Sequence, residues 1–189
     1  MNLSAVLLAG GESLRMGRDK ATMLFRDRPL WKHQLELFRA LECEEIFVSA
    51  RFDPSWRPAA VEFVADAQPS RGPMSGIAAG LSRIRTNHLL VLAIDVPFMS
   101  ASYLRELRRR VGPGRGVVPM IGSRAEPLAA IYPRKAEVDF RMAILGNDFS
   151  LQPLVAGLVA AGKLEAVRVL EKERGLFRNL NEPSDLDGG

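Results

Sequence analysis

The chain has 189 residues, of which 47% are hydrophobic, so it is long enough for one domain with a sizeable core and too short to divide comfortably into two. Lys and Arg outnumber Asp and Glu by 26 to 22, and this mild excess of positive charge suits a small anionic ligand. No basic stripe with interleaved aromatic residues is present, which argues against a nucleic acid as partner.

Cysteine content and hydropathy indicate the compartment. Cys43 is the only cysteine, so an intrachain disulfide is excluded and a reducing compartment is favoured. The longest apolar run, residues 89–94, is far below the ~20 residues that span a bilayer. No signal peptide is visible. We expect a soluble, cytoplasmic protein without a membrane partner.

The first predicted element is a buried strand that ends in a glycine pair. Residues 4–9 form a short apolar run, and the sequence continues as LAGGESLRMGRDK from Leu8 to Lys20. Gly10 and Gly11 lack Cβ atoms, so their backbone amides can approach phosphates closely. Arg15 and Lys20 supply positive charge to phosphate oxygens. The pattern predicts a triphosphate-binding loop at the carboxyl end of a strand.

The spacing of glycine and lysine distinguishes this loop from other glycine-rich motifs. A Walker-type loop requires Gly-Lys-Ser/Thr, whereas Gly17 is followed by Arg18 and Asp19. The GPGRG at residues 112–116 follows an amphipathic segment and is interpreted as a turn. An ordinary glycine turn with solvated basic residues remains the simplest alternative.

Strands and helices alternate along the rest of the chain. Helical spacing predicts helices that begin at Pro29, at Ser75 and at Ser100, with both serines acting as caps. Apolar runs predict strands at 46–50, 63–65, 88–94 and 166–170, a hairpin of 117–121 with 127–132, and helices near 136–145 and 150–161. This order indicates a three-layer α/β domain with a mostly parallel sheet and a small antiparallel insertion, spanning residues 1–189 as a single domain.

Two aspartates follow predicted strands. Asp95 ends the most hydrophobic run, where a carboxylate needs a cation, hydrogen bonds or solvent. Magnesium favours one or two protein oxygens together with phosphate oxygens, so Asp95 is a candidate metal ligand; capping of the next helix is the alternative. Asp66 could bind a base edge, a ribose hydroxyl or a backbone amide, and its sequence position does not separate these uses.

Four segments together resemble a known family. LAGGESLRMGRDKA, the GPMSGIAAGL that begins at Gly72, AIDVP and FRNLNEPSDL are similar to the molybdenum cofactor guanylyltransferase (MobA) family over nearly the whole chain. The resemblance implies a Rossmann-like nucleotidyltransferase fold. It also implies that GTP and molybdopterin-bound molybdenum react, with Mg²⁺, to form a guanine dinucleotide cofactor and pyrophosphate.

The resemblance also implies roles for individual residues. The nucleotide contacts carried over by position are Leu8, Ala9, Gly10, Lys20, Ser49 and Asp66, to which the loop argument adds Gly11. Asp95 is expected to contact both nucleotide and metal, and Asn181 to be a second metal contact. Arg15, Lys20 and Asp95 are the expected catalytic residues. The chain departs from the family pattern at Leu14, Ser49, Ala93, Ile94 and Glu182, which affects ligand detail more than reaction class.

Two other functions fit parts of the sequence. A cytidylyltransferase, or another nucleotidyltransferase acting on a small phosphate, would share the loop and Asp95. A noncatalytic nucleotide sensor, or an adaptor for molybdoenzyme assembly, belongs to a different class, and assembly proteins of molybdoenzymes are candidate partners. The dinucleotide formed from mixed triphosphates, and the release of pyrophosphate, would discriminate these hypotheses.

Overall fold

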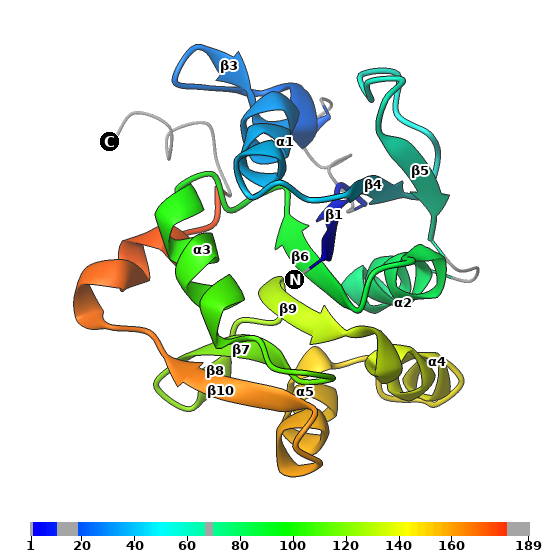
Figure 1. Cartoon of the computed structure of the whole chain (residues 1–189). Coiled ribbons are helices and arrows are strands. Elements are labelled where there is room, and N and C mark those ends of the chain that lie inside the picture. The colour runs from blue at the N-terminus through cyan, green and yellow to red at the C-terminus, as the bar shows by residue number, and fades with distance from the viewer. Residues whose placement is uncertain (1, 11–18, 67–69, 181–189) are drawn as a thin grey trace.

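A mostly parallel sheet forms the centre of the molecule. The computed structural model describes residues 2–10, 19–66 and 70–180. Within these residues the strands of the main sheet lie in the order β10-β7-β9-β6-β1-β4-β5, and β8 pairs with β7 (Figure 1). These strands are β1 (Leu3–Leu8), β4 (Glu45–Ala50), β5 (Glu62–Ala65), β6 (His88–Ala93), β7 (Gly116–Ile121), β8 (Arg124–Ala125), β9 (Ala129–Pro133) and β10 (Leu164–Arg168).

The predicted antiparallel insertion is confirmed. β1 pairs in parallel with both β4 and β6, and β10 pairs in parallel with β7. β9 is antiparallel to β6 and to β7, and the two-residue β8 turns back on β7. A second, small antiparallel sheet joins β2 (Leu24–Phe25) to β3 (Arg28–Pro29). The sequence did not predict this second sheet.

Helices cover both faces of the main sheet. α1 (Leu30–Ala40) and α3 (Ala101–Arg110) lie on one face, while α2 (Pro73–Arg83), α4 (Glu137–Ile144) and α5 (Leu151–Ala160) lie on the other. Alternate residues of each central strand enter opposite cores: Leu7 packs with α1, whereas Val6 packs with α2. This division follows from the period of two in a strand. The three-layer prediction is therefore confirmed.

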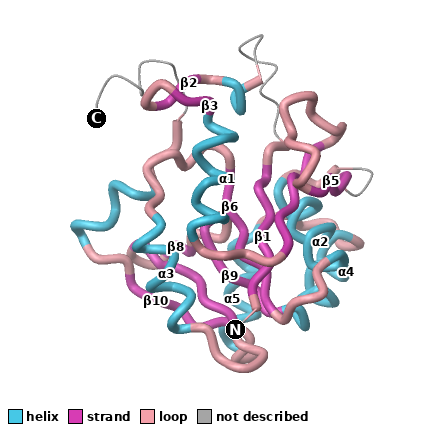
Figure 2. Tube along the Cα trace, turned by 45° about the horizontal axis from the view of Figure 1, so that its top comes forward, coloured by secondary structure: helices cyan, strands magenta, loops and turns pink. Residues whose placement is uncertain are grey.

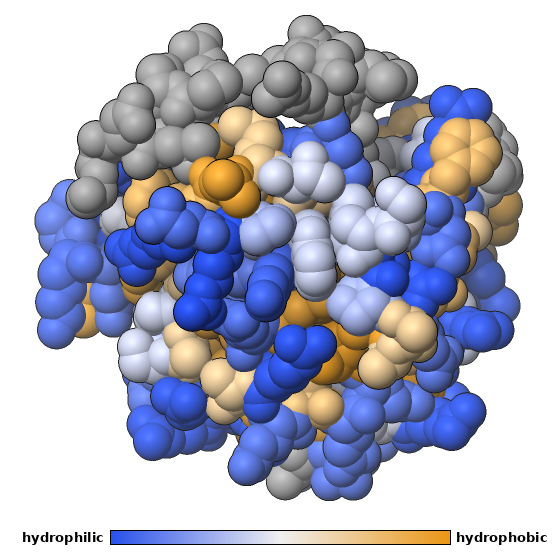
Figure 3. Space-filling view, turned by 90° about the horizontal axis from the view of Figure 1, so that it is seen from above, coloured by the Kyte–Doolittle hydropathy of each residue, from blue (hydrophilic) through white to orange (hydrophobic). Residues whose placement is uncertain are grey.

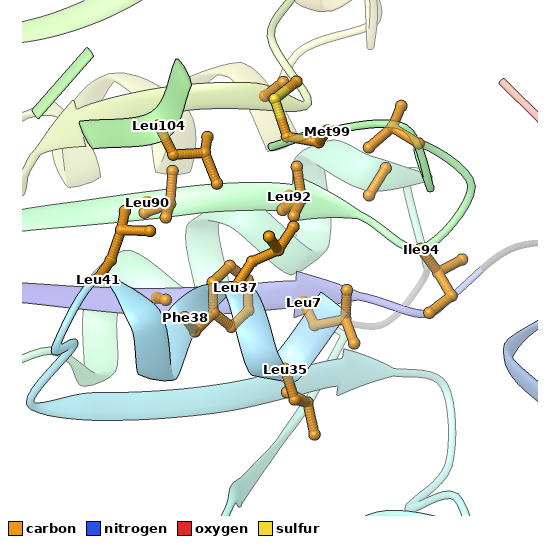
Figure 4. Packing of buried hydrophobic residues seen from close by; sticks show 14 of the residues in the cluster. Leu7, Leu35, Leu37, Phe38, Leu41, Leu90, Leu92, Ile94, Met99 and Leu104 are labelled. Carbon is orange, nitrogen blue, oxygen red and sulfur yellow. The ribbon is translucent and has the colours of Figure 1, made fainter. Parts of the chain in front are cut away.

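The core between α1, α3 and the sheet is mostly apolar, with Gln34 of α1 as a buried polar side chain that donates to the Val96 carbonyl at 2.9 Å. Figure 4 shows Leu37 and Phe38 of α1 beside Leu7 of β1 and Leu90 of β6, with Leu104 of α3 above them. Phe38, Leu7 and Leu90 are fully buried. The complete burial of β1 and β6 explains why nearly all residues of both strands are apolar in the sequence.

The helix starts differ in how well the sequence predicts them. Ser100 caps α3 as expected, because its Oγ accepts a hydrogen bond from the Tyr103 amide at 3.2 Å. The expectation that Ser75 caps α2 is wrong. Gly72 is the N-cap, with φ of 62°, and Pro73 occupies the first turn. Ser75 lies inside the helix and accepts instead from the Arg71 amide at 2.9 Å.

The tube in Figure 2 shows that the carboxyl ends of β1, β4 and β6 point to the same end of the molecule, where the small β2–β3 sheet and the loop before β5 also lie. The face that Figure 3 shows from above is mostly polar, with scattered apolar residues. Ligands of open α/β sheets bind at this end. Among the described residues, no helix has the length and apolar character that crossing a membrane requires.

Candidate active site

The backbone brings the glycine loop and Asp95 together. In the β1–β6 pairing Leu8 lies opposite Ala93, so Ala9 and Ile94 leave the sheet side by side. The Ile94 amide donates to the Leu8 carbonyl at 3.1 Å, which continues the ladder one residue past the strand end. The strand register therefore sets the separation between the start of the glycine loop and Asp95.

A third strand holds the start of the glycine loop. The amides of Ala9 and Gly10 both donate to the Ser49 carbonyl at the end of β4, at 2.8 and 3.2 Å. Leu8 is buried and Ala9 is partly buried. The structure thus brings Leu8, Ala9, Gly10 and Ser49 together at the carboxyl ends of β1 and β4, and their contact with a nucleotide stays a prediction.

Lys20 and Asp95 meet across this edge. Lys20 begins a short 3-10 helix, Lys20–Thr22, and its Nζ lies 3.7 Å from Asp95 Oδ2. The two side chains are 18% and 29% exposed, so both are accessible to a ligand. Residues that are 75 positions apart in the sequence (20 and 95) therefore present opposite charges at one place. An ammonium and a carboxylate together can hold an anionic ligand and its counter-cation.

Asp66 is enclosed behind the loop. Its side chain is 9% exposed, and its Oδ1 accepts from Ser49 Oγ at 2.6 Å. Burial raises the pKa of the Asp66 carboxyl, and the hydrogen bond from Ser49 opposes this shift. A Cβ on Gly10 would lie 2.8 Å from Asp66 Oδ2, so a larger residue at the point where the loop passes the carboxylate would displace it.

A cavity opens on the other side of Asp95. Its volume is about 290 Å³, and it is lined by Asp95 and Asn179 together with the β8–β9 connection and the start of α5. The Leu180 amide donates to the Asp95 carbonyl at 2.8 Å, which holds Asn179 at this cavity. The Ala125 amide donates to Gln152 Oε1 at 3.0 Å, and Gln152 Nε2 donates to the Ala125 carbonyl at 2.9 Å. These two hydrogen bonds hold the wall of the cavity opposite Asp95.

The sequence analysis missed two features of the site. Glu126 lines the cavity, and burial raises the pKa of its carboxyl while nearby Arg124 lowers it. Trp56 donates its indole N–H to Asp19, the residue that precedes Lys20. Sequence position gives no signal for either contact, because both residues lie in connections between strands. Gly11, Arg15 and Asn181 lie outside the described residues.

The donor set at Asp95 fits a magnesium ion that is shared with phosphates. Within residues 2–10, 19–66 and 70–180 there is no cluster of three or more His, Cys, Asp or Glu side chains able to enclose a metal. Asp95 offers one partly exposed carboxylate, and Lys20 already places a positive charge beside it. Magnesium is commonly bound by one or two carboxylates with phosphate oxygens and waters, so a site completed by substrate is the form that these residues allow.

Two curated proteins are similar to this chain over nearly its whole length. A probable molybdenum cofactor guanylyltransferase of Opitutus terrae is 36% identical over 98% of this chain and 93% of its own length. A molybdenum cofactor guanylyltransferase of Syntrophotalea carbinolica is 33% identical over 97% of this chain and 89% of its own.

The solved structures share the fold. Molybdopterin-guanine dinucleotide biosynthesis protein A from Archaeoglobus fulgidus superposes with a TM-score of 0.73 at 24% identity, covering 97% of this chain and 95% of its own. The model of the MobA-like NTP transferase domain matches residues 5–183. The chain therefore belongs to the MobA-like NTP transferase domain family and is a nucleotidyltransferase.

Proposed function

We propose that this enzyme transfers GMP from GTP to the terminal phosphate of molybdopterin-bound molybdenum cofactor, forming molybdopterin guanine dinucleotide and pyrophosphate in a Mg²⁺-dependent reaction. The observation that carries the proposal is the 3.7 Å approach of Lys20 Nζ to Asp95 Oδ2, between the glycine loop and the 290 Å³ cavity. This arrangement offers one side for a triphosphate and the other for an acceptor. The relatives' names supply the identity of the two substrates.

In the proposed reaction, an oxygen of the cofactor's phosphate attacks the α-phosphorus of GTP. The bond from that phosphorus to the bridging oxygen breaks, and its electron pair leaves with pyrophosphate. A phosphate monoester has a second pKa of about 6, so the nucleophile is already largely ionised near neutral pH and needs no general base. Catalysis then depends on holding two anions together and stabilising charge on the leaving group.

The proposal assigns the binding of phosphates and the stabilisation of charge to particular residues. Gly10 lets the backbone approach the phosphates, and Lys20 neutralises phosphate charge next to Asp95. Arg15 and Gly11 are proposed to assist from the same loop. Mg²⁺, held by Asp95 and with Asn181 as a second candidate ligand, would supply additional positive charge to the phosphates when bound.

The proposed nucleoside site lies toward Ser49 and Asp66. Asp66 Oδ1 accepts from Ser49, and the buried carboxylate lies behind Gly10. A carboxylate can accept from the N1 and exocyclic amino groups of guanine, whereas cytosine presents a different edge. Guanine is therefore the proposed base. A cytidylyltransferase with the same phosphate machinery is the alternative.

The decisive experiment mixes equal concentrations of GTP, CTP and ATP with the molybdenum cofactor and magnesium, then identifies the dinucleotide and measures pyrophosphate. We expect the guanine dinucleotide with stoichiometric pyrophosphate. A cytosine product would replace the proposed substrate while leaving the reaction class intact. Nucleotide binding without pyrophosphate release would favour a sensor over an enzyme. Omission of magnesium, with EDTA present, is expected to stop turnover.

A further inference from the structure

An indole ring contacts the turn that carries Lys20. Trp56 lies in the connection between β4 and β5, and its Nε1 donates to Asp19 Oδ2 at 2.6 Å. Asp19 uses its other oxygen, Oδ1, to accept from the Ala21 amide at 3.0 Å. The Asp19 carboxylate therefore links the Trp56 indole to the backbone of Ala21, the residue that follows Lys20.

Asp19 also caps the short helix in which Lys20 lies. The Thr22 hydroxyl donates to the Asp19 carbonyl at 2.8 Å, and the Thr22 amide donates to the same oxygen at 3.0 Å. Lys20–Thr22 has one turn only, and turns this short have poor hydrogen-bond geometry and little stability of their own. The direction of Lys20 therefore depends on what holds Asp19.

The connection that carries Trp56 is braced by its own side chains. Arg57 forms two hydrogen bonds with the carboxylate of Asp53, both at 2.7 Å, and donates to the carbonyls of Pro58 and Val61. The Trp56 ring stacks on Trp31 of α1, with centroids 5.7 Å apart and planes at 16°. Both tryptophans are partly buried and pack against the hydrophobic core on the α1 side of the sheet. Trp56 is therefore presented to Asp19 from a rigid support.

We propose that Trp56 is a positioning residue for nucleotidyl transfer: through Asp19, it holds Lys20 in the orientation that meets Asp95 and the triphosphate. This inference rests on the proposed function for the role of Lys20, and it adds a connection between the β4–β5 segment and the phosphate site. Trp56 does not touch the reacting atoms; it fixes the turn from which Lys20 reaches them.

The test uses Trp56→Phe, which keeps an aromatic ring for the stack with Trp31 and removes the indole N–H. Trp31→Phe is the matched control, because it changes the same stack without altering the donor to Asp19. We expect Trp56→Phe to weaken binding of magnesium triphosphate about fivefold, since a hydrogen bond to a charged group is lost. The control is expected to remain within about twofold of wild type.

A structural role alone would also weaken binding, so the same substitution is repeated in a Lys20→Met background. If Trp56 acts through Lys20, Trp56→Phe will change the Kd by less than about twofold once the ammonium is absent, because coupled residues give non-additive effects. Calorimetry with the triphosphate that wild type binds most tightly among GTP, CTP and ATP supplies the Kd values. Circular dichroism confirms that each variant is folded.

The outcomes separate this proposal from the proposed function. Equal weakening by Trp56→Phe in both backgrounds, or no weakening in either, would overturn the positioning role even when wild type forms the dinucleotide. Failure of wild type to form any dinucleotide would overturn the proposed function, and the binding cycle would still decide whether Trp56 acts through Lys20. A loss in Trp31→Phe as large as that in Trp56→Phe would assign the effect to the stack and reject the indole N–H.

Discussion

Replacement of Gly76 by alanine tests how closely α2 approaches the active site. Gly76 is buried in α2, and a Cβ at this position would lie 2.7 Å from Leu8 Cδ2 and 2.8 Å from Ser49 Oγ. Asp66 Oδ1 would lie 3.3 Å away. The added methyl therefore meets the end of β1 and the Ser49–Asp66 hydrogen bond at once, so Gly76→Ala is expected to disturb both the packing and the nucleotide site.

The magnitude follows from two opposing effects. Alanine in a helix interior is more stable than glycine by up to about 1 kcal/mol. Overpacking costs about 1–3 kcal/mol, and a weakened buried hydrogen bond adds about 1 kcal/mol. The expected net loss in the free energy of unfolding is about 1–3 kcal/mol. Gly157 of α5 provides the control, because a Cβ there meets nothing within 4 Å and alanine should stabilise the protein.

Urea unfolding of both variants measures this difference directly. Gly157→Ala should raise the free energy of unfolding by up to about 1 kcal/mol, whereas Gly76→Ala should lower it. Titration with GTP should show weaker binding only for Gly76→Ala, since only that substitution displaces Ser49 from Asp66. Equal stability of the two variants, with equal GTP affinity, would refute the close packing of α2 against the site.

Three further variants test the site. Asp95→Ala should nearly abolish pyrophosphate release while circular dichroism remains unchanged; normal magnesium-dependent turnover would remove Asp95 from the mechanism. Asp66→Asn should gain stability relative to wild type as the pH rises from about 4 to 7. Burial raises the pKa of Asp66 in the folded state, so the stabilisation from its protonated form is complete below the unfolded pKa and is lost as pH rises through the folded pKa. Denaturation of both proteins at several pH values measures how the difference between their free energies of unfolding changes with pH. A difference that stays constant with pH would contradict the raised pKa. Gln152→Leu should destabilise the protein by about 1–3 kcal/mol in thermal unfolding because both backbone groups of Ala125 lose their partner, and an unchanged Tm would reject this bridge.

Much of the fold could be predicted because burial determines the apolar pattern. β1 and β6 are buried on both faces, and both gave mostly hydrophobic runs, in which Ser4 and His88 are the polar residues. The small β2–β3 hairpin gave no such signal, since its strands have two residues each. Its turn places Arg26 and Asp27 at positive φ, where Asn-Gly is the usual sequence signature. Short elements whose turn residues are unusual are hidden from pattern analysis.

The candidate site could be predicted only in part, because strand ends are local features and contacts between loops are not. The apolar runs predicted that Gly10 and Asp95 follow the ends of two strands. Because β1 and β6 pair in parallel with Leu8 opposite Ala93, these two positions are neighbours in the structure. The same reasoning could not place Trp56 against Asp19, since no period relates residues of two irregular connections. It also misassigned Ser75, because Gly72 and Pro73 begin α2 three residues earlier.

The weakness of the Lys20–Asp95 contact is itself informative about its role. At 3.7 Å between partly exposed charges, such a pair contributes only about 0–1 kcal/mol to stability. Stability therefore does not explain why two ordered backbone segments bring these charges together. In the proposed reaction a weak pair is easily separated by a triphosphate and its cation, and each partner would then have an oppositely charged ligand group to bind. The same geometry that adds little to the folded state thus leaves both charges available for the proposed nucleotidyl transfer.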